Sequence, residues 1–96
     1  MSLETLAAKY IGSAEKVFIE LQQIKGSFLI SETQVEEVLR WATDYLEDAK
    51  YYKVQGKLET SLTSVAYCEG LLDALRLLGA VTFEWPTSQE PKKSLS

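Results

Sequence analysis

The chain has 96 residues, of which 46% are hydrophobic and 25% are charged, and its formal net charge is −4. This length predicts one domain, and the composition is typical of an ordinary soluble globular protein. An acidic protein repels phosphates, so we expect no nucleic-acid partner. Histidine is absent, which excludes Ser-His and Cys-His nucleophile pairs and every histidine-ligated metal site.

Cys68 is the single cysteine, so an internal disulfide cannot form, and a reducing, cytoplasmic setting is predicted. No apolar run approaches the roughly 20 residues that a bilayer span requires. The first residues also lack the basic start and apolar stretch of a signal peptide. We therefore expect no membrane partner, and nothing in the sequence indicates a cofactor.

The first predicted helix covers residues 3–24. Its apolar residues recur at steps of three and four, which places them in one stripe along the helix. Lys25, Gly26 and Ser27 are predicted to end it, with Gly26 in the left-handed cap conformation. A short apolar connection, residues 28–30, should lie across one end of the bundle. The stripe contains Leu3, Leu6, Ala7, Tyr10, Ile11, Ala14, Val17, Phe18, Leu21 and Ile24.

The second predicted helix begins with a capping box, in which the Ser31 hydroxyl accepts from the Gln34 amide and the Gln34 side chain reaches back. Glu32 in the first turn suits the helix dipole, and Gly56 stops the helix. Its inward stripe consists of Val35, Val38, Leu39, Ala42, Tyr45, Leu46, Ala49 and Tyr52, with Trp41 on the edge.

The third predicted helix runs from Lys57 or Leu58 to Leu78, with Gly79 as its cap. Its second half is apolar nearly all round, which is typical of the most buried helix or of one that meets a second chain. Ala66, Gly70 and Ala74 lie four residues apart. This run of small residues predicts the close approach of another backbone.

An extended arm, residues 80–85, should follow the third helix, with Phe83 and Trp85 packing back onto the bundle. Residues 87–96 are polar and are predicted to form a disordered tail beyond a single domain, residues 1–86. Three stripes of similar length with short connections predict an all-α fold, an up-down-up three-helix bundle. Dimerisation through the apolar back of the third helix is an open alternative.

Residues 46–79 read LEDAKYYKVQGKLETSLTSVAYCEGLLDALRLLG and resemble the archaeal domain-of-unknown-function family 357. The resemblance implies a three-helix bundle and no established activity. Leu58 stands where an aromatic residue is common in that family, and Ser61 and Cys68 stand where alanine is common, so packing details should differ. The matching features are Ala49, Tyr51-Tyr52, Gly56, Tyr67, the run from Glu69 to Ala74, and Leu78-Gly79.

A polar cluster of Glu69, Asp73 and Arg76, with Tyr51 as a candidate fourth member, is open to two interpretations. The carboxylates could bind a divalent cation or act as an acid–base pair, which is the basis of an alternative function as a small metal-dependent phosphohydrolase. The preferred interpretation is structural, with Arg76 neutralising Asp73 and Glu69 paired to a lysine such as Lys50. All-α pyrophosphohydrolases typically use four acids from two helices, but the other acidic candidates are predicted to point outward: Glu36, Glu37, Glu47 and Asp48.

An aromatic row on the second helix, Trp41, Tyr45 and Tyr52, could anchor a partner together with Phe83 and Trp85, because aromatic residues dominate binding hot spots. The preferred interpretation makes the row the edge of the core. The sequence as a whole predicts a non-enzymatic protein-interaction or oligomerisation module. Its partner would be a second copy of the chain, giving a homo-oligomer, or an unidentified protein.

Overall fold

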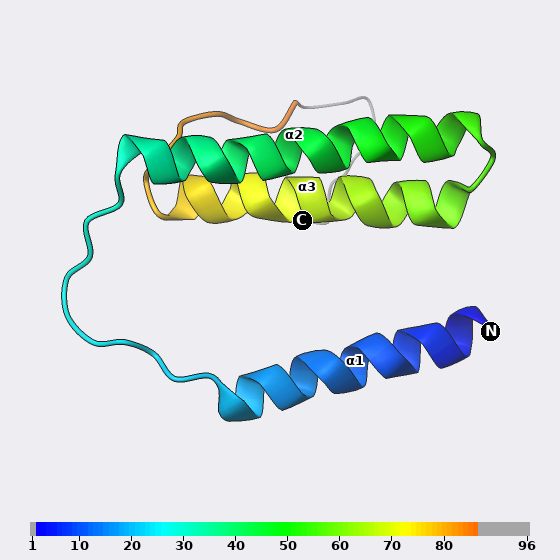
Figure 1. Cartoon of the computed structure of the whole chain (residues 1–96), viewed down its shortest axis with the longest axis horizontal. Coiled ribbons are helices and arrows are strands. Elements are labelled where there is room, and N and C mark those ends of the chain that lie inside the picture. Colours follow the sequence, from blue (N-terminus) through cyan, green and yellow to red (C-terminus); the bar gives the residue numbers. More distant parts are fainter. Residues whose placement is uncertain (1, 87–96) are drawn as a thin grey trace.

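Three helices, α1 (Leu3–Glu20), α2 (Glu32–Val54) and α3 (Leu58–Leu77), make up the computed structural model, which describes residues 2–86. Figure 1 shows α1 and α3 running in one direction and α2 in the other. No strand occurs within the described part of the chain. The all-α class and the up-down-up order of the three helices are confirmed. The predicted tail, 87–96, lies outside the described residues.

A hairpin of α2 and α3 forms the packed part of the molecule. Its buried side chains are Ala42, Ala49, Cys68 and Leu75, at 3 to 5% exposure. Since three of these are small, the helices approach closely enough for the Ser61 hydroxyl to donate to the Ala49 carbonyl at 2.8 Å. The predicted close approach of a backbone at Ala66, Gly70 and Ala74 is not formed within the described part of the chain, where nothing lies within 4 Å of a Cβ built on Gly70.

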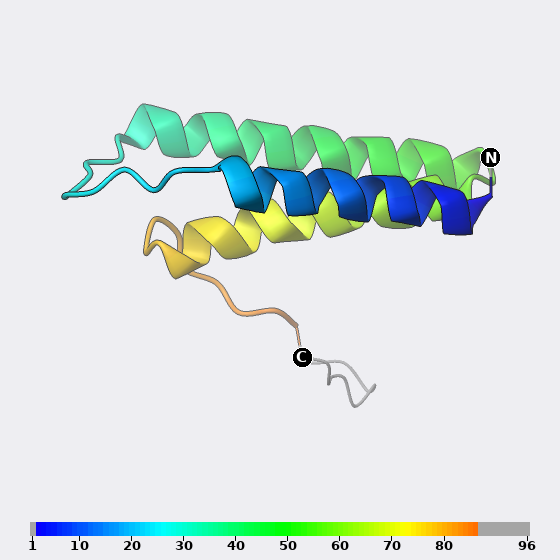
Figure 2. The same cartoon turned by 90° about the horizontal axis from the view of Figure 1, so that it is seen from below.

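The helix α1 stands apart from this hairpin. The helix–helix contacts of the described residues join α2 to α3, and α1 has no buried residue. Figures 1 and 2 show α1 running alongside the hairpin and separated from it. The structure therefore has the predicted order of helices, whereas the predicted packing of the first stripe into a closed bundle is not formed.

The first helix also ends one turn earlier than predicted, at Glu20 instead of Ile24. A helix that buries no side chain is held by local propensity alone, so its last turn is weakly stabilised. The connection, residues 21–30, is extended, with Gly26 at φ 111°. It runs from the end of α1 to the start of α2 (Figure 1).

Local signals set the other helix ends as predicted. The Ser31 hydroxyl accepts from the Gln34 amide at 3.1 Å, and the Gln34 side chain accepts from the Ser31 amide at 2.9 Å. At the end of α3, Gly79 has φ 81°, and the Ala80 amide donates to the Leu75 carbonyl at 2.9 Å. This is the Schellman arrangement that a glycine in the left-handed region permits.

The arm, residues 80–85, is extended as predicted and packs back onto the hairpin. Phe83 is half-buried, and the exposed fraction of Trp85 is 39%. Figures 1 and 2 together place the arm and α1 on opposite faces of the hairpin. None of the described helices has the length and apolar character of a membrane span.

Candidate functional site

Asp73 holds the C-terminal arm against α3. Its Oδ1 accepts from the Arg76 guanidinium at 3.0 Å and from the Trp85 indole N–H at 2.9 Å. The Arg76 guanidinium lies 5.3 Å from the centre of the Phe83 ring, and Phe83 meets Trp85 edge to face at 5.0 Å. The structure thus brings two members of the predicted polar cluster together with two aromatic residues that were predicted as partner-binding.

The ionised form of Asp73 is the one that these contacts stabilise. The Trp85 hydrogen bond first, and the Arg76 hydrogen bond second, hold the pKa of the Asp73 carboxyl below its ordinary range. A carboxylate that accepts two hydrogen bonds and faces a guanidinium resembles a structural clamp more than a metal ligand or a general base. This geometry agrees with the part of the structural interpretation in which Arg76 neutralises Asp73.

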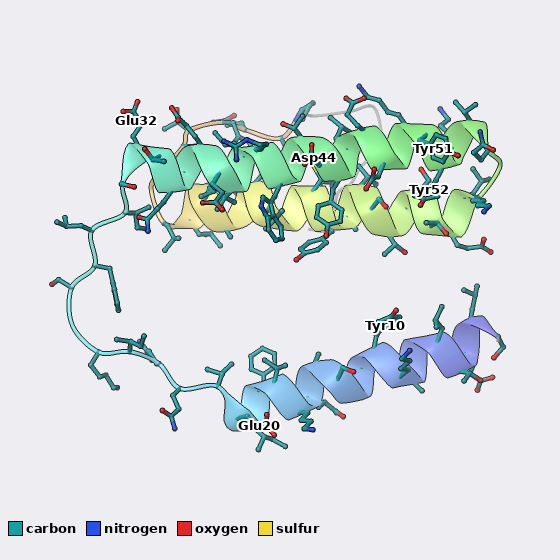
Figure 3. The ribbon with its side chains drawn as sticks, in the orientation of Figure 1. Tyr10, Glu20, Glu32, Asp44, Tyr51 and Tyr52 are labelled. Atoms are coloured by element: carbon teal, nitrogen blue, oxygen red, sulfur yellow. The ribbon has the colours of Figure 1, made fainter. Side chains whose placement is uncertain are left out.

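The remaining members of the predicted cluster lie elsewhere. Lys50 pairs with Glu47 of its own helix at 3.1 Å, so the expected pairing of Lys50 with Glu69 is not formed. Tyr51 stands near the far end of α2 (Figure 3), with its ring 5.2 Å from that of Tyr52. No group of three or more acidic, cysteine or histidine residues that could hold a metal ion occurs among residues 2–86.

We call the contacts of Asp73 with Arg76 and Trp85 the clamp, and we expect these contacts to be lost in acid. Because the folded-state pKa of Asp73 is depressed, its contribution is complete above the unfolded value of about 3.9 and is lost as pH falls through the folded value. We expect the fluorescence of Trp85, recorded in a Trp41→Phe background, to change in that window. Asp73→Asn is the matched control, since an amide oxygen still accepts from the indole but does not titrate. The same transition in the Asn variant would contradict the assignment.

A second feature is an aromatic face on the hairpin, which consists of Val38, Trp41, Tyr45, Tyr52, Tyr67 and Leu71. Spacings of four and seven residues place Trp41, Tyr45 and Tyr52 on one flank of α2. The Tyr45 ring lies 4.4 Å from the Tyr67 ring of α3, so the face continues across both helices. Its tryptophan is 52% exposed and Tyr67 is 48% exposed.

This aromatic face looks toward α1. Asp73 and Arg76 hold the arm against one flank of α3, whereas Tyr67 and Leu71 occupy another flank by helical spacing. Since the arm and α1 lie on opposite faces of the hairpin, the aromatic face is on the α1 side. Figure 3 shows Tyr10 of α1 pointing toward the hairpin across the intervening space.

Two hollows lie along the aromatic face, and acidic residues border both. Trp41 and Tyr45 line one of them with Asp44 and Asp48. Trp41, Val38 and Leu71 line the other with Glu37. The α2 side of the face therefore has an acidic border, which we call the acidic rim: Glu37, Asp44 and Asp48.

Sequence reasoning found the α2 half of this face but not its continuation. The sequence predicts no partner-binding role for Tyr67, although its four-residue spacing to Leu71 indicates that the two share a flank of the helix. Tyr45 and Tyr52 are half-buried, as the edge of a core would be, while Trp41 is exposed. The acidic rim was visible only as residues that point outward.

Cys68 is buried between the helices, at 5% exposure. Burial first, and the charge of Glu69 second, raise the pKa of the Cys68 thiol. A protonated and enclosed thiol is a poor nucleophile.

These features define a small all-α protein in which a packed helical hairpin bears a clamped arm on one face and an open aromatic surface on the other. A family model matches residues 6–81, and the chain therefore belongs to the family described as protein of unknown function (DUF357). The match covers α1 from residue 6 onward as well as the hairpin, which confirms the resemblance seen in residues 46–79. No curated protein and no solved structure gives a significant match.

Proposed function

We propose that this protein is a non-enzymatic protein-interaction or oligomerisation module, and that its binding surface is the aromatic face together with the apolar stripe of α1. The observation that supports the proposal is the exposure of Trp41 and Tyr67 on a face that no described element covers. Contiguous exposed apolar surface of this kind marks association sites. Trp and Tyr are also the residues most enriched in binding hot spots.

The state of α1 supports the same proposal. An isolated helix of 18 residues is only marginally stable in water. Phe18 and Tyr10 are 78% and 61% exposed, so the stripe has yet to gain the burial that stabilises most protein helices. Association is the means by which both surfaces lose their contact with water.

The phosphohydrolase alternative has less support. It requires Glu69 and Asp73 to share a ligand, yet Asp73 accepts hydrogen bonds from Arg76 and Trp85. An arginine at 3.0 Å would compete with a cation for the carboxylate. Cytoplasmic location and archaeal origin stay predictions from the single cysteine and from the family resemblance.

Sedimentation velocity of the full chain tests the proposal. We expect species heavier than the 10.8 kDa monomer at tens of micromolar protein. Trp41→Glu should weaken association at least about tenfold, because a truncated hot spot costs about 2 kcal/mol or more. Thr43→Glu is the control, since it adds the same charge at an exposed position of α2 away from the aromatic face. A strict monomer at every concentration, or equal effects of the two variants, would contradict the proposal.

A further inference from the structure

We propose, building on the function proposed above, that the partner is a second copy of this chain and that the two copies exchange α1. In the resulting two-fold dimer, α1 of each copy lies on the aromatic face of the other. Each hairpin then completes a three-helix core with a helix it did not supply. Such an isologous arrangement is closed, and it leaves no unpaired copy of the interface to bind a third chain.

The shape and direction of α1 suit the aromatic face. The stripe of α1 presents Leu6, Tyr10 and Val17 at helical spacing. Its 18 residues extend about 27 Å, which covers the roughly 21 Å from Val38 to Tyr52 over which the aromatic face runs along α2. In Figures 1 and 2, α1 runs antiparallel to α2 and along the hairpin. An exchanged α1 takes the same direction and level over the partner's hairpin.

Charge complementarity also favours α1 as the helix that binds the aromatic face. Lys9 and Lys16 lie seven residues apart on one border of the α1 stripe. In Figure 3, Tyr10 stands at a level between Asp44 and Tyr52. By sequence, Lys9 adjoins Tyr10 and Asp48 is midway between Asp44 and Tyr52, so Lys9 comes within about a turn of the level of Asp48. Lys16, about 10 Å further along, comes within a turn of Asp44. Both lysines therefore meet the acidic rim.

The connection indicates that the helix comes from a second copy. Helix–helix connections in bundles usually have 2–8 residues and are polar. In this chain the connection is extended over residues 21–30 and its large apolar side chains are 46 to 99% exposed: Leu21, Ile24, Phe28, Leu29 and Ile30. In an exchanged dimer the two connections run past each other and bury these side chains. A helix folded back on its own hairpin would leave Leu21, Ile24 and Leu29 on a surface loop. Phe28 and Ile30 already line a hollow at the end of their own hairpin.

The size of the contact is also sufficient. The two α1 stripes, the two aromatic faces and the crossed connections bring about 20 residues from each copy into the interface, which is typical of stable complexes. Closure on the chain's own hairpin is the competing arrangement, because tethering supplies an effective concentration in the millimolar range. The experiment must therefore separate exchange from closure.

Complementary charge reversal makes that separation. One variant combines Lys9→Glu with Lys16→Glu, and a second combines Asp44→Lys with Asp48→Lys. Either variant alone places like charges together and should associate at least about tenfold more weakly than the wild-type chain. Mixing them should restore dimers, because in the exchanged heterodimer both contacts join opposite charges. Closure within one chain gains nothing from mixing, so a mixture that stays as weak as its components overturns the exchange.

Cross-linking gives a second readout. In a Cys68→Ala background, Lys9→Cys and Asp48→Cys should yield a covalent dimer on oxidation, seen on a non-reducing gel. Lys9→Cys with Thr43→Cys is the control pair and should stay uncoupled. If the chain associates in sedimentation but forms only a disulfide within one chain, or no disulfide, then exchange is refuted and the proposed function stands. A wild-type chain that is strictly monomeric in sedimentation refutes both.

Discussion

Replacing Leu75 with alanine is expected to lower the free energy of unfolding by about 2–4 kcal/mol, because truncating a buried leucine removes transfer energy and leaves a cavity. Leu75 is the large side chain buried between α2 and α3, at 4% exposure. Leu77→Ala is the matched control on the same helix, since Leu77 is 80% exposed. Its effect should stay within about 0.5 kcal/mol.

Urea unfolding followed by circular dichroism measures both Leu75→Ala and Leu77→Ala. All samples need one protein concentration, because association adds to the apparent stability by mass action. Equal losses at the two positions would show that the hairpin does not bury Leu75 against α2. They would also indicate that Leu77 is as well buried as Leu75.

Enlarging Ala49 should have the next largest effect. Ala49 is 5% exposed, and its carbonyl oxygen lies 2.8 Å from the Ser61 hydroxyl of the facing helix. Ala49→Leu must push the helices apart, at a cost of about 1–3 kcal/mol. Ala66→Leu makes the same chemical change at an exposed position of α3. It should be nearly neutral in the same urea titration.

Comparison of Ala49→Leu with Ala66→Leu also tests where α2 and α3 approach each other most closely. The sequence suggested close approach at Ala66, Gly70 and Ala74, whereas the structure places it at Ala42, Ala49 and Cys68. A larger loss from Ala66→Leu than from Ala49→Leu would reverse that assignment.

The two faces of the hairpin have different roles. The arm and Asp73 close one face with contacts inside the chain, whereas the aromatic face carries exposed tryptophan and tyrosine. Covering one face internally directs association to the other. For that reason the predicted partner-binding set divides: Trp41 belongs to the proposed interface, and Phe83 and Trp85 belong to the clamp.

The sequence by itself determined the elements whose causes are local. The capping box of Ser31 and Gln34 starts α2, and Gly56 and Gly79 at positive φ end α2 and α3. These signals act within a few residues, so they can be seen in the chain without knowledge of the fold. The three amphipathic patterns likewise specified an all-α protein.

Only the tertiary structure decided which surfaces meet. Asp73 and Trp85 are 12 residues apart in the sequence and are joined by a hydrogen bond. The residues next to them in the sequence do not predict this bond. Likewise, an apolar stripe shows that α1 needs burial but not which surface supplies it. The stripe stands open beside the hairpin, and α1 ends at Glu20. An amphipathic pattern specifies that one face of a helix must be buried. Which surface buries that face depends on contacts with residues that are distant in the sequence or that belong to another chain.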